Sequence, residues 1–324
     1  MYMNIFLMSS LIFSTLISIS SNTWFGIWMG LEINLMSFIP IMNSNNNMYS
    51  SESSMKYFFI QALSSMILFF SLIYFYLTKS KTLIMFNIIM MMKMGSAPFH
   101  FWFIEIMNKL NWYNSFMLMS WQKLIPMIII NYSMNFYLIM FIIYLNMLIS
   151  LIKINQNKIQ KIFSYSSINN MGWMMSLMLV NKTLWMMFIT IYSTILFNLI
   201  YLLNMYKIFM MNHLFMKMNF NLFNLFLFSN FISMMSIPPF IGFLTKWMTI
   251  QNLIFNNYYL ITITMMMMTS IMSYMYIKMI LNSFLLNSLK NNFYKMIIIP
   301  KLFHFNNFFN LISMIMSPYF FMFL

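Results

Sequence analysis

This 324-residue chain consists largely of about eleven apolar stretches, and most of them are long enough to cross a bilayer as one helix. The chain is 62% apolar and 6% charged, a composition that excludes an ordinary soluble domain. Its polar segments are too short to form a separate domain outside the membrane. The sequence predicts an all-α polytopic membrane protein, with one transmembrane domain over 1–324 and spans at 3–20, 23–42, 55–77, 82–105, 112–131, 134–152, 159–180, 183–206, 222–252, 258–281 and 303–324.

Two of the predicted spans contain helix-breaking residues beside a lysine. The fourth reads MKMGSAPFHFW around Lys93, and the ninth reads SIPPFIGFLTKW before Lys246. Proline removes a hydrogen bond from a helix interior, and non-helical backbone at membrane depth is stable only where protein or a watery cavity satisfies it. Helices 4 and 9 are therefore expected to be discontinuous. The interrupting residues are Gly95, Pro98, Pro238, Pro239 and Gly242.

The two interrupted spans are five apart, so they cross the membrane in opposite directions. This arrangement is typical of inverted-topology repeats, whose binding sites lie near the interface of the repeats. It predicts antiporter-like five-helix halves at approximately 1–131 and 134–281, followed by an extra helix at approximately 303–324. The alternative is that each proline and glycine cluster only kinks its helix for packing.

Four ionisable residues lie inside the predicted spans: Glu32, Lys93, Lys123 and Lys246. A charge at the bilayer centre costs about 2.5–3.5 kcal/mol on insertion scales, and such residues commonly mark ion or proton paths. A carboxylate that moves relative to a buried lysine can switch that lysine between holding and releasing a proton. The four residues are thus candidates for a proton relay. The alternatives are a satisfied ion pair, or lysines that extend to the membrane surface.

Several polar residues near these positions are secondary candidates. His100 follows the break in the fourth span, where it either relays protons or hydrogen-bonds carbonyls freed by the break. Ser166 and Asn170 lie in an unusually polar seventh span and either line a water path or hold helices together. Glu105 is expected at the membrane interface, and Glu52 is expected to be a solvated charge.

The charge pattern favours membrane orientation over nucleic-acid binding. The chain has seventeen basic residues against three acidic ones, and the lysines fall mostly between apolar stretches. Cytoplasmic-side loops are rich in lysine, which places the N-terminus on the inner side and, with eleven spans, the C-terminus outside. The loops on the N-terminal side hold Lys56, Lys109, Lys153, Lys158, Lys161, Lys207, Lys217, Lys290, Lys295 and Lys301, whereas the opposite loops hold Lys79, Lys81 and Lys182.

The sequence offers no site for a cofactor or metal. It has no cysteine, which excludes disulfides, thiolate nucleophiles and cysteine-ligated iron–sulfur clusters in this chain. It also lacks a phosphate-binding glycine loop, a nucleophile elbow and an HExxH motif. The chain alone is not expected to catalyse a reaction.

Six segments, in this order, resemble the NADH dehydrogenase subunit 2 family, the mitochondrially encoded antiporter-like membrane subunits of respiratory complex I. They are WFGIWMGLEINLMSFIP, MKYFFIQALSSMILF, MMKMGSAPFHFWF, WQKLIPM, IQKIFSYSSINNMGWMM and SIPPFIGFLTKW. The 46 methionines beside one valine and two alanines fit an A+T-rich animal mitochondrial genome that reads ATA as methionine. The resemblance places the family's glutamate at Glu32 and its three relay lysines at Lys93, Lys123 and Lys246.

The resemblance implies a non-redox subunit of a proton-pumping NADH:ubiquinone reductase. The family translocates protons, coupled to quinone reduction elsewhere in the complex, while FMN, iron–sulfur clusters, NADH and ubiquinone bind to other subunits. It implies a mitochondrial inner-membrane protein, with its N-terminus in the matrix and its C-terminus in the intermembrane space. The expected partners are other membrane-arm subunits and lipids such as cardiolipin, and the chain is not expected to function as an isolated monomer.

The chain departs from the family at two positions. Asn170 stands where relatives commonly have histidine, and Ile104 stands where they have proline. An amide does not titrate near neutral pH, so a relay through position 170 must use water or does not exist here. Two other readings stay open: a subunit of a multisubunit cation/proton antiporter, and a purely structural membrane-arm subunit.

Overall fold

The computed structural model describes residues 2–43, 47–78, 83–152, 156–217, 222–238 and 240–287, and these residues form helices with short connections. The chain divides into two compact units at Asn146 and Met147, inside helix α8 (Phe136–Leu151). The predicted repeat halves meet close to this division, and their inverted relationship stays a prediction. The predicted final span at 303–324 lies outside the described residues.

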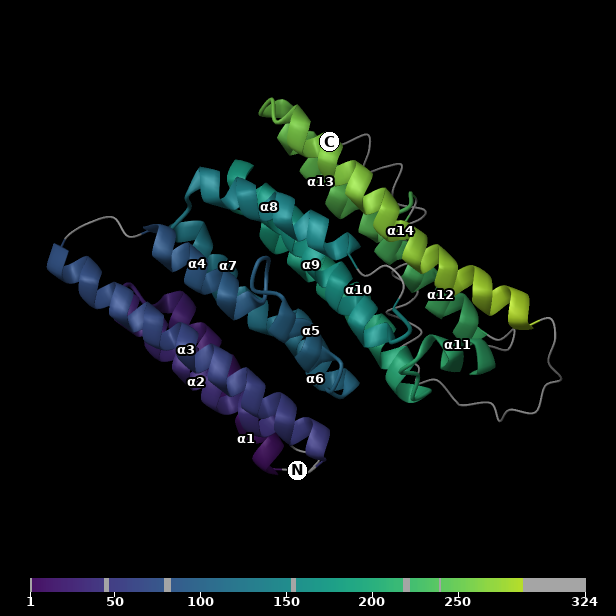
Figure 1. The fold of residues 1–324 in the computed structure, drawn as a ribbon, viewed down its shortest axis with the longest axis horizontal. Helices are drawn as coiled ribbons and strands as arrows, with labels where there is room; N and C mark the ends of the chain where they lie inside the picture. The colour runs from purple at the N-terminus through teal and green to yellow at the C-terminus, as the bar shows by residue number, and fades with distance from the viewer. Residues whose placement is uncertain are drawn as a thin grey trace. The chain divides into compact units, whose positions relative to one another are not determined.

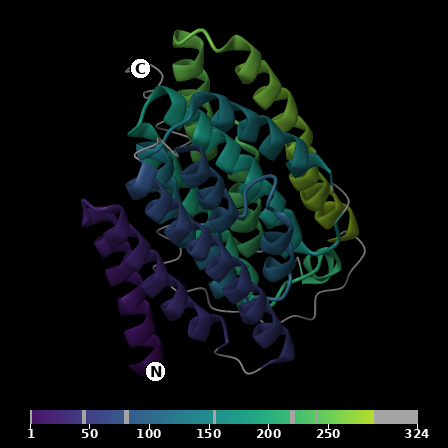
Figure 2. The same cartoon turned by 60° about the vertical axis from the view of Figure 1, so that its left-hand side comes forward.

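The first unit contains three long helices and several shorter segments. Helix α2 packs against both α1 and α3, α3 packs against α4, and α7 packs against α4 and α1 (Figures 1 and 2). These contacts close a ring of helices around the interior of the unit. The elements are α1 (Tyr2–Ser20), α2 (Trp24–Met42), α3 (Met48–Thr78), α4 (Leu83–Met94), α5 (Phe101–Met107), α6 (Trp112–Met119), the 3-10 turn η1 (Trp121–Lys123) and α7 (Leu124–Tyr132).

The predicted fourth span is discontinuous, as the sequence indicated. Helix α4 ends at Met94, and Gly95 adopts a positive φ of 67° that L side chains rarely tolerate. The amides of Gly95 and Ser96 donate to the carbonyls of Met92 and Met91, the two hydrogen bonds of a Schellman helix end. Glycine therefore ends this helix two residues after Lys93.

Surrounding side chains satisfy the backbone of this break. The Gln61 amide donates to the carbonyl of Lys93 at 3.0 Å, and the Trp102 indole donates to that of Met92 at 3.2 Å. The Asn146 side-chain oxygen accepts the amide hydrogen of Ala97 at 2.7 Å. Protein groups thus provide the hydrogen bonds that non-helical backbone needs at membrane depth.

The predicted fifth span is also discontinuous, although the sequence indicated one continuous helix there. Helix α6 ends at Met119, and η1 intervenes before α7 begins at Leu124. Pro126 lacks an amide hydrogen and crowds the carbonyl four residues earlier, that of Gln122, which opposes a continuous helix. The Ser120 hydroxyl donates to the Phe116 carbonyl at 2.7 Å, a bond that also bends helices. This second break positions Lys123.

The second unit is built around α9, most of whose residues are buried. Helix α9 contacts α10, α13 and α14, and α10 also contacts α12 and α13. The short helix α11 was not predicted from the sequence. The elements of this unit after α8 are α9 (Ile159–Val180), α10 (Leu184–Met205), α11 (Met211–Lys217), α12 (Leu222–Met235), α13 (Ile241–Phe255) and α14 (Tyr259–Asn287).

The predicted ninth span is discontinuous, as expected. Helix α12 ends at Met235, Ser236 has a positive φ of 59°, and α13 begins at Ile241. A Cβ at Gly242 would lie 1.8 Å from the carbonyl oxygen of Ser233, so the two half-helices approach at a distance that only glycine allows. Pro239 lies outside the described residues.

Hydrogen bonds between segments agree with the predicted order of membrane crossings. The Asn114 amide at the start of α6 donates to the Ile41 carbonyl at the end of α2, at 3.1 Å. On the opposite side, the Ser133 hydroxyl at the end of α7 donates to Asn87 near the start of α4, at 2.7 Å. The second and fourth loops therefore meet on one side, and the third and fifth loops are expected on the other.

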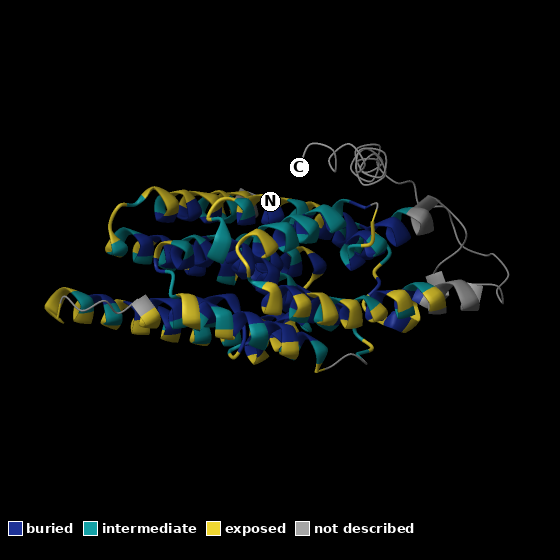
Figure 3. Cartoon of the chain, turned by 90° about the horizontal axis from the view of Figure 1, so that it is seen from above, coloured by how far each residue is buried: buried dark blue, intermediate teal, exposed yellow. Residues whose placement is uncertain are grey.

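Four helices are long and apolar enough to span a membrane by length and composition: Trp24–Met42, Met48–Thr78, Leu184–Met205 and Tyr259–Leu281. Large apolar side chains are exposed along these helices (Figure 3). On α3, for example, Leu63, Met66 and Phe70 are exposed. Exposed apolar surface on this scale marks contact with lipid or other subunits. The other predicted spans among the described residues are shorter or interrupted helices, except α9, which has 22 residues but is rich in serine and asparagine.

Candidate functional site

Lys123 is the most deeply buried charged residue among those described, with 1% of its surface exposed. It ends η1, so the break in the fifth span sets the direction of its side chain. Its Nζ has no hydrogen-bond partner and lies 5.1 Å from the centre of the Phe103 ring. Methionine at this position would pack against the aromatic face almost as well as lysine does, so packing does not explain the lysine. The position therefore suits a group that exchanges protons.

Lys93 is buried at the end of α4, with 5% of its surface exposed. It lines a cavity of about 10 Å³ in the first unit, together with the polar side chains of Asn34, Tyr57, Gln61 and Gln122. A cavity needs roughly 10–15 Å³ to hold one water, so this space is at the lower limit for a single molecule. The walls offer several hydrogen-bonding groups to such a water.

Glu32 is partly buried on α2 and interacts electrostatically with Lys93. Its neighbours Leu31 and Asn34 line the Lys93 cavity. The structure thus brings together the two residues that the sequence paired as carboxylate and lysine. Their roles in a relay remain predictions.

A group of hydrogen-bonded polar side chains lies beside Lys93, and the sequence did not predict it. The Gln122 amide donates to the Asn34 side-chain oxygen at 3.0 Å, and the Tyr57 hydroxyl lies 3.4 Å from the Gln122 oxygen. Gln122 precedes Lys123 directly and lines the same cavity as Lys93. The sequence signal was the polar pair before Pro126 in WQKLIPM.

His100 serves the backbone of the first break. Its Nδ1 lies 3.0 Å from the Pro98 carbonyl, and its ring packs at a tilt against Phe101 with centroids 4.1 Å apart. This geometry favours the second of the two expected roles, in which histidine satisfies a carbonyl freed by the break. It leaves the proton-relay role of His100 without support from these contacts.

Lys246 lies on α13, one turn after Gly242, in the second unit. It is partly buried, and its Nζ lies 5.8 Å from the centre of the fully buried Trp173 ring. Each of the two units therefore holds a lysine against an aromatic ring near a helix break, Lys123 on Phe103 and Lys246 on Trp173. The breaks determine both arrangements.

Ser166 and Asn170 both lie near Lys246, on α9. The Ser166 hydroxyl donates to the Phe163 carbonyl of its own helix at 3.0 Å, and other serines of α9 make the same type of bond. These serines thus donate their hydroxyl hydrogens within α9. Ser166, Asn169 and Asn170 also line a cavity with Lys246.

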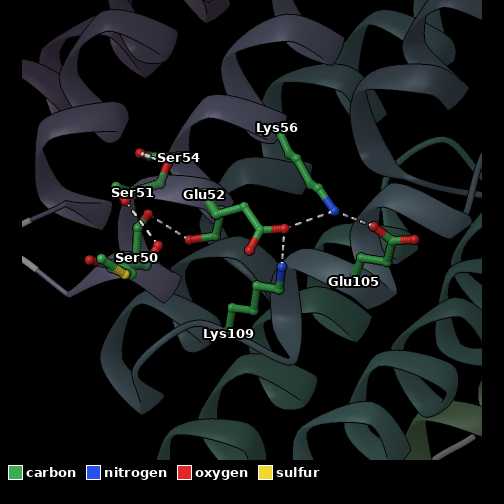
Figure 4. A network of polar contacts seen from close by, with 9 residues as sticks. Ser50, Ser51, Glu52, Ser54, Lys56, Glu105 and Lys109 are labelled. Atoms are coloured by element: carbon green, nitrogen blue, oxygen red, sulfur yellow. Dashed lines mark hydrogen bonds and ion pairs between the residues drawn. The ribbon is translucent and has the colours of Figure 1, made fainter.

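An exposed ionic cluster lies at the start of α3 and the end of α5 (Figure 4). The Lys56 ammonium pairs with Glu52 at 3.2 Å and with Glu105 at 2.8 Å, and Lys109 also pairs with Glu52. Helix α3 has 31 residues, or about 46 Å, so its first turns extend past a hydrocarbon core of about 30 Å. The interfacial position expected for Glu105 fits this cluster, whereas Glu52 is an ion-paired residue and not simply a solvated charge.

Loss of a carboxylate from this cluster is expected to have only a small effect. We expect Glu52→Gln to lower the melting temperature of the solubilised protein slightly, and more than Glu105→Gln, because Glu52 contacts two lysines and Glu105 contacts Lys56. Exposed ion pairs contribute little and are screened by salt. Thermal unfolding at low and high salt measures both variants. Equal effects, or effects that persist in high salt, would contradict this assignment.

The described residues include no cluster of histidine, cysteine, aspartate or glutamate that could hold a metal ion. The cavities around Lys93 and Lys246 are too small for an organic cofactor. Their chemistry consists of lysines, amides and hydroxyls. Such groups can bind water and move protons.

Sequence comparisons find related proteins along most of the chain. Residues 21–273 match the family described as NADH:quinone oxidoreductase/Mrp antiporter, TM. The NADH-ubiquinone oxidoreductase chain 2 of Anopheles gambiae is 43% identical over 89% of this chain and 88% of its own length. The protein of the same name from Aedes aegypti is 40% identical over 87% of this chain and 86% of its own length.

Three solved structures with a similar fold belong to different kinds of membrane complex. A chain of respiratory complex I from Thermus thermophilus aligns with a TM-score of 0.81 at 14% identity, covering 98% of this chain and 78% of that one. A chain of the Mrp complex from Dietzia has a TM-score of 0.71 at 13% identity, over 84% of this chain and 59% of that one. A chain of an archaeal membrane-bound sulfane sulfur reductase has a TM-score of 0.79 at 14% identity, over 98% of this chain and 73% of that one. At these identities the likeness concerns the fold.

Proposed function

Since the chain belongs to the NADH:quinone oxidoreductase/Mrp antiporter family of membrane proteins, we propose that it is a proton-translocating subunit of the membrane arm of respiratory complex I. The relatives at 43% and 40% identity carry the name of a complex I chain and match nearly their full length. The protein would then be a multi-pass component of the mitochondrial inner membrane. Electron transfer, with its NADH, flavin, iron–sulfur clusters and quinone, would take place in other subunits.

The observation that carries this proposal is the position of the buried lysines at helix breaks. Lys93 and Lys123 lie at or next to the ends of interrupted helices, and Lys246 lies one turn into a half-helix. The end of a helix carries the partial charge of the helix dipole, which acts on a nearby charged group. A structural bundle gains nothing from lysines at such positions, because removing them would avoid the cost of burying charge.

In the proposed relay, protons move through lysines that both units contribute. Glu32 modulates Lys93 through their electrostatic interaction, Lys123 is the central relay, and Lys246 is the relay of the second unit. Gln122 directly precedes Lys123 and lines the Lys93 cavity, and this proximity is the support for exchange between the two lysines. A lysine that gives up a proton becomes a neutral amine, and it returns to the ammonium form by accepting the next proton.

We further propose that the N-terminus faces the matrix and the C-terminus the intermembrane space. The supporting observation is that loop lysines concentrate on one side of the predicted topology, with Lys56 and Lys109 drawn together by Glu52. Limited proteolysis of right-side-out and inverted inner-membrane vesicles, with an antibody against the N-terminal residues, tests this orientation. Protection of the epitope only in vesicles that enclose the matrix side supports it, and the reverse pattern excludes it.

Membership in the complex is tested with a native gel of mildly solubilised mitochondrial membranes. We expect the chain to migrate with the high-mass band that stains for NADH dehydrogenase activity. Its absence from that band would reject the proposal and favour the second candidate, a subunit of a multisubunit cation/proton antiporter. That candidate draws its support from the fold shared with the Mrp complex, whereas the identity to complex I chains favours the first.

A further inference from the structure

Lys246 lies between two separate cavities of the second unit. The first, the break cavity, follows the interruption between α12 and α13 and has a volume of about 20 Å³; Tyr192, Ser233 and Thr245 are among its walls. The second, the bundle cavity, has a volume of about 10 Å³ and is lined by Ser166, Asn169 and Tyr276, among others. Lys246 and Asn170 line both cavities. The lysine therefore has access to a small space on each of two sides.

Each cavity also contains a buried hydroxyl without a hydrogen-bond partner. The Tyr192 hydroxyl in the break cavity and the Tyr276 hydroxyl in the bundle cavity are both unsatisfied, as is the Asn169 side-chain oxygen. Polar side chains lie near these hydroxyls without hydrogen-bond geometry, Asn170 and Ser167 near Tyr192 and Ser166 near Tyr276. Most buried polar groups are paired with protein or with ordered water.

The volumes decide what can pair with these hydroxyls. A buried water needs roughly 10–15 Å³ of cavity volume and two to four polar partners. The break cavity meets the volume requirement, and the bundle cavity is at its lower limit. Both offer a tyrosine hydroxyl, an ammonium and the amide of Asn170. A larger ligand does not fit in either space.

We propose that each cavity holds one ordered water, which links Lys246 to Tyr192 on one side and to Tyr276 on the other. The inference rests on the proposed function, in which Lys246 carries protons, and it identifies the groups with which Lys246 exchanges them. Asn170 donates and accepts hydrogen bonds at the junction of the two cavities but does not titrate. It therefore holds the waters in place, but protons cannot pass from one cavity to the other through Asn170 and must pass through Lys246.

The proton balance of the step is closed. The Lys246 ammonium gives one proton to the water of one cavity, which becomes a hydronium ion hydrogen-bonded to the neighbouring tyrosine oxygen. Lys246 is left as a neutral amine. It returns to the ammonium form by accepting a proton from a hydronium ion at the water site of the other cavity, which is left as neutral water. No oxidant, reductant or metal is needed.

A cryo-EM map of the intact complex, at a resolution that shows ordered waters, tests the two sites directly. We expect one water within about 2.7–3.2 Å of the Tyr192 hydroxyl and another at that distance from the Tyr276 hydroxyl. Both waters should also contact Asn170 or Lys246. Dry cavities, or direct hydrogen bonds from both hydroxyls to protein groups, would overturn the proposal.

The variants Tyr192→Phe and Tyr276→Phe in the intact complex test the role of each hydroxyl. Each is expected to lose the water of its own cavity, keep that of the other, and translocate fewer protons per NADH oxidised. Tyr201→Phe on α10 and Tyr274→Phe on α14 are the matched controls, because neither residue lines the cavities. If a variant loses the water of its cavity while its fold is unchanged, the tyrosine hydroxyl binds that water and does more than fill space.

A further variant, Lys246→Met, distinguishes the failure of this inference from that of the proposed function. Suppose that Lys246→Met lowers proton translocation while both phenylalanine variants match their controls. The proposed waters at Tyr192 and Tyr276 are then rejected, and the relay through Lys246 stands. If Lys246→Met also translocates protons at the normal ratio, the proposed relay role of Lys246 is wrong, and the inference fails with it.

Discussion

Replacement of Lys123 by methionine is expected to abolish most proton translocation by the complex while leaving the complex assembled. Lys123 is buried with no hydrogen-bond partner, at a helix break that fixes its direction. Methionine has a similar length and no titratable group, so it fills the same space without carrying a proton. The number of protons translocated per NADH oxidised, measured with the purified complex in liposomes, should fall sharply.

Stability is expected to change little in this variant. The contact of the ammonium with the Phe103 ring is worth about 0.5–2 kcal/mol and is lost. This loss is offset because an unsatisfied polar group is no longer buried. A native gel with activity staining measures assembly in parallel with translocation.

The control is Lys182→Met, which removes an exposed lysine outside the helices and should leave translocation unchanged. Normal translocation by Lys123→Met would exclude a relay through this residue. Loss of the assembled complex would instead assign Lys123 a structural role, and would favour the reading of the chain as a purely structural subunit.

The helix breaks show how far the sequence alone predicts this fold. Glycine and proline act locally on the backbone, so the interruptions after Lys93 and before Lys246 could be predicted from neighbouring residues. The break at Ser120 was missed, although Pro126 crowds the Gln122 carbonyl by the same mechanism. A lone proline is common in membrane helices and is often accommodated as a kink, so its effect depends on packing that the sequence does not specify.

The sequence predicted which ionisable residues belong to the candidate site, but it did not predict which side chains contact them. Buried charge is costly, so Glu32 and the three lysines stood out from their apolar surroundings. Asparagine, glutamine and tyrosine do not stand out in this way, because they also occur at helix ends and membrane interfaces. The links from Gln122 to Asn34 and from Gln61 to the Lys93 carbonyl join residues far apart in sequence. Only the packing of the helices brings them together.

The largest structural effect is expected for Gly242→Ala. An alanine Cβ would lie 1.8 Å from the Ser233 carbonyl oxygen, far inside van der Waals contact. The clash is with backbone, so no side-chain rotation relieves it, and α12 and α13 must separate at the break. Overpacking typically costs about 1–3 kcal/mol, and a backbone clash of this size should reach the upper end of that range.

The amount of assembled complex and its melting temperature measure this effect. Both should fall clearly in Gly242→Ala, and proton translocation by the remaining complex should fall as well, because Lys246 lies one turn further along α13. Gly26→Ala is the control, since its Cβ would meet only the side chains of Ser21 and Thr23, at 2.8 Å or more. If Gly242→Ala assembled and melted like Gly26→Ala, the close approach of the half-helices would not exist in the assembled protein. The positions assigned to Lys246 and to both of its cavities depend on that approach, so the same result would remove their structural basis.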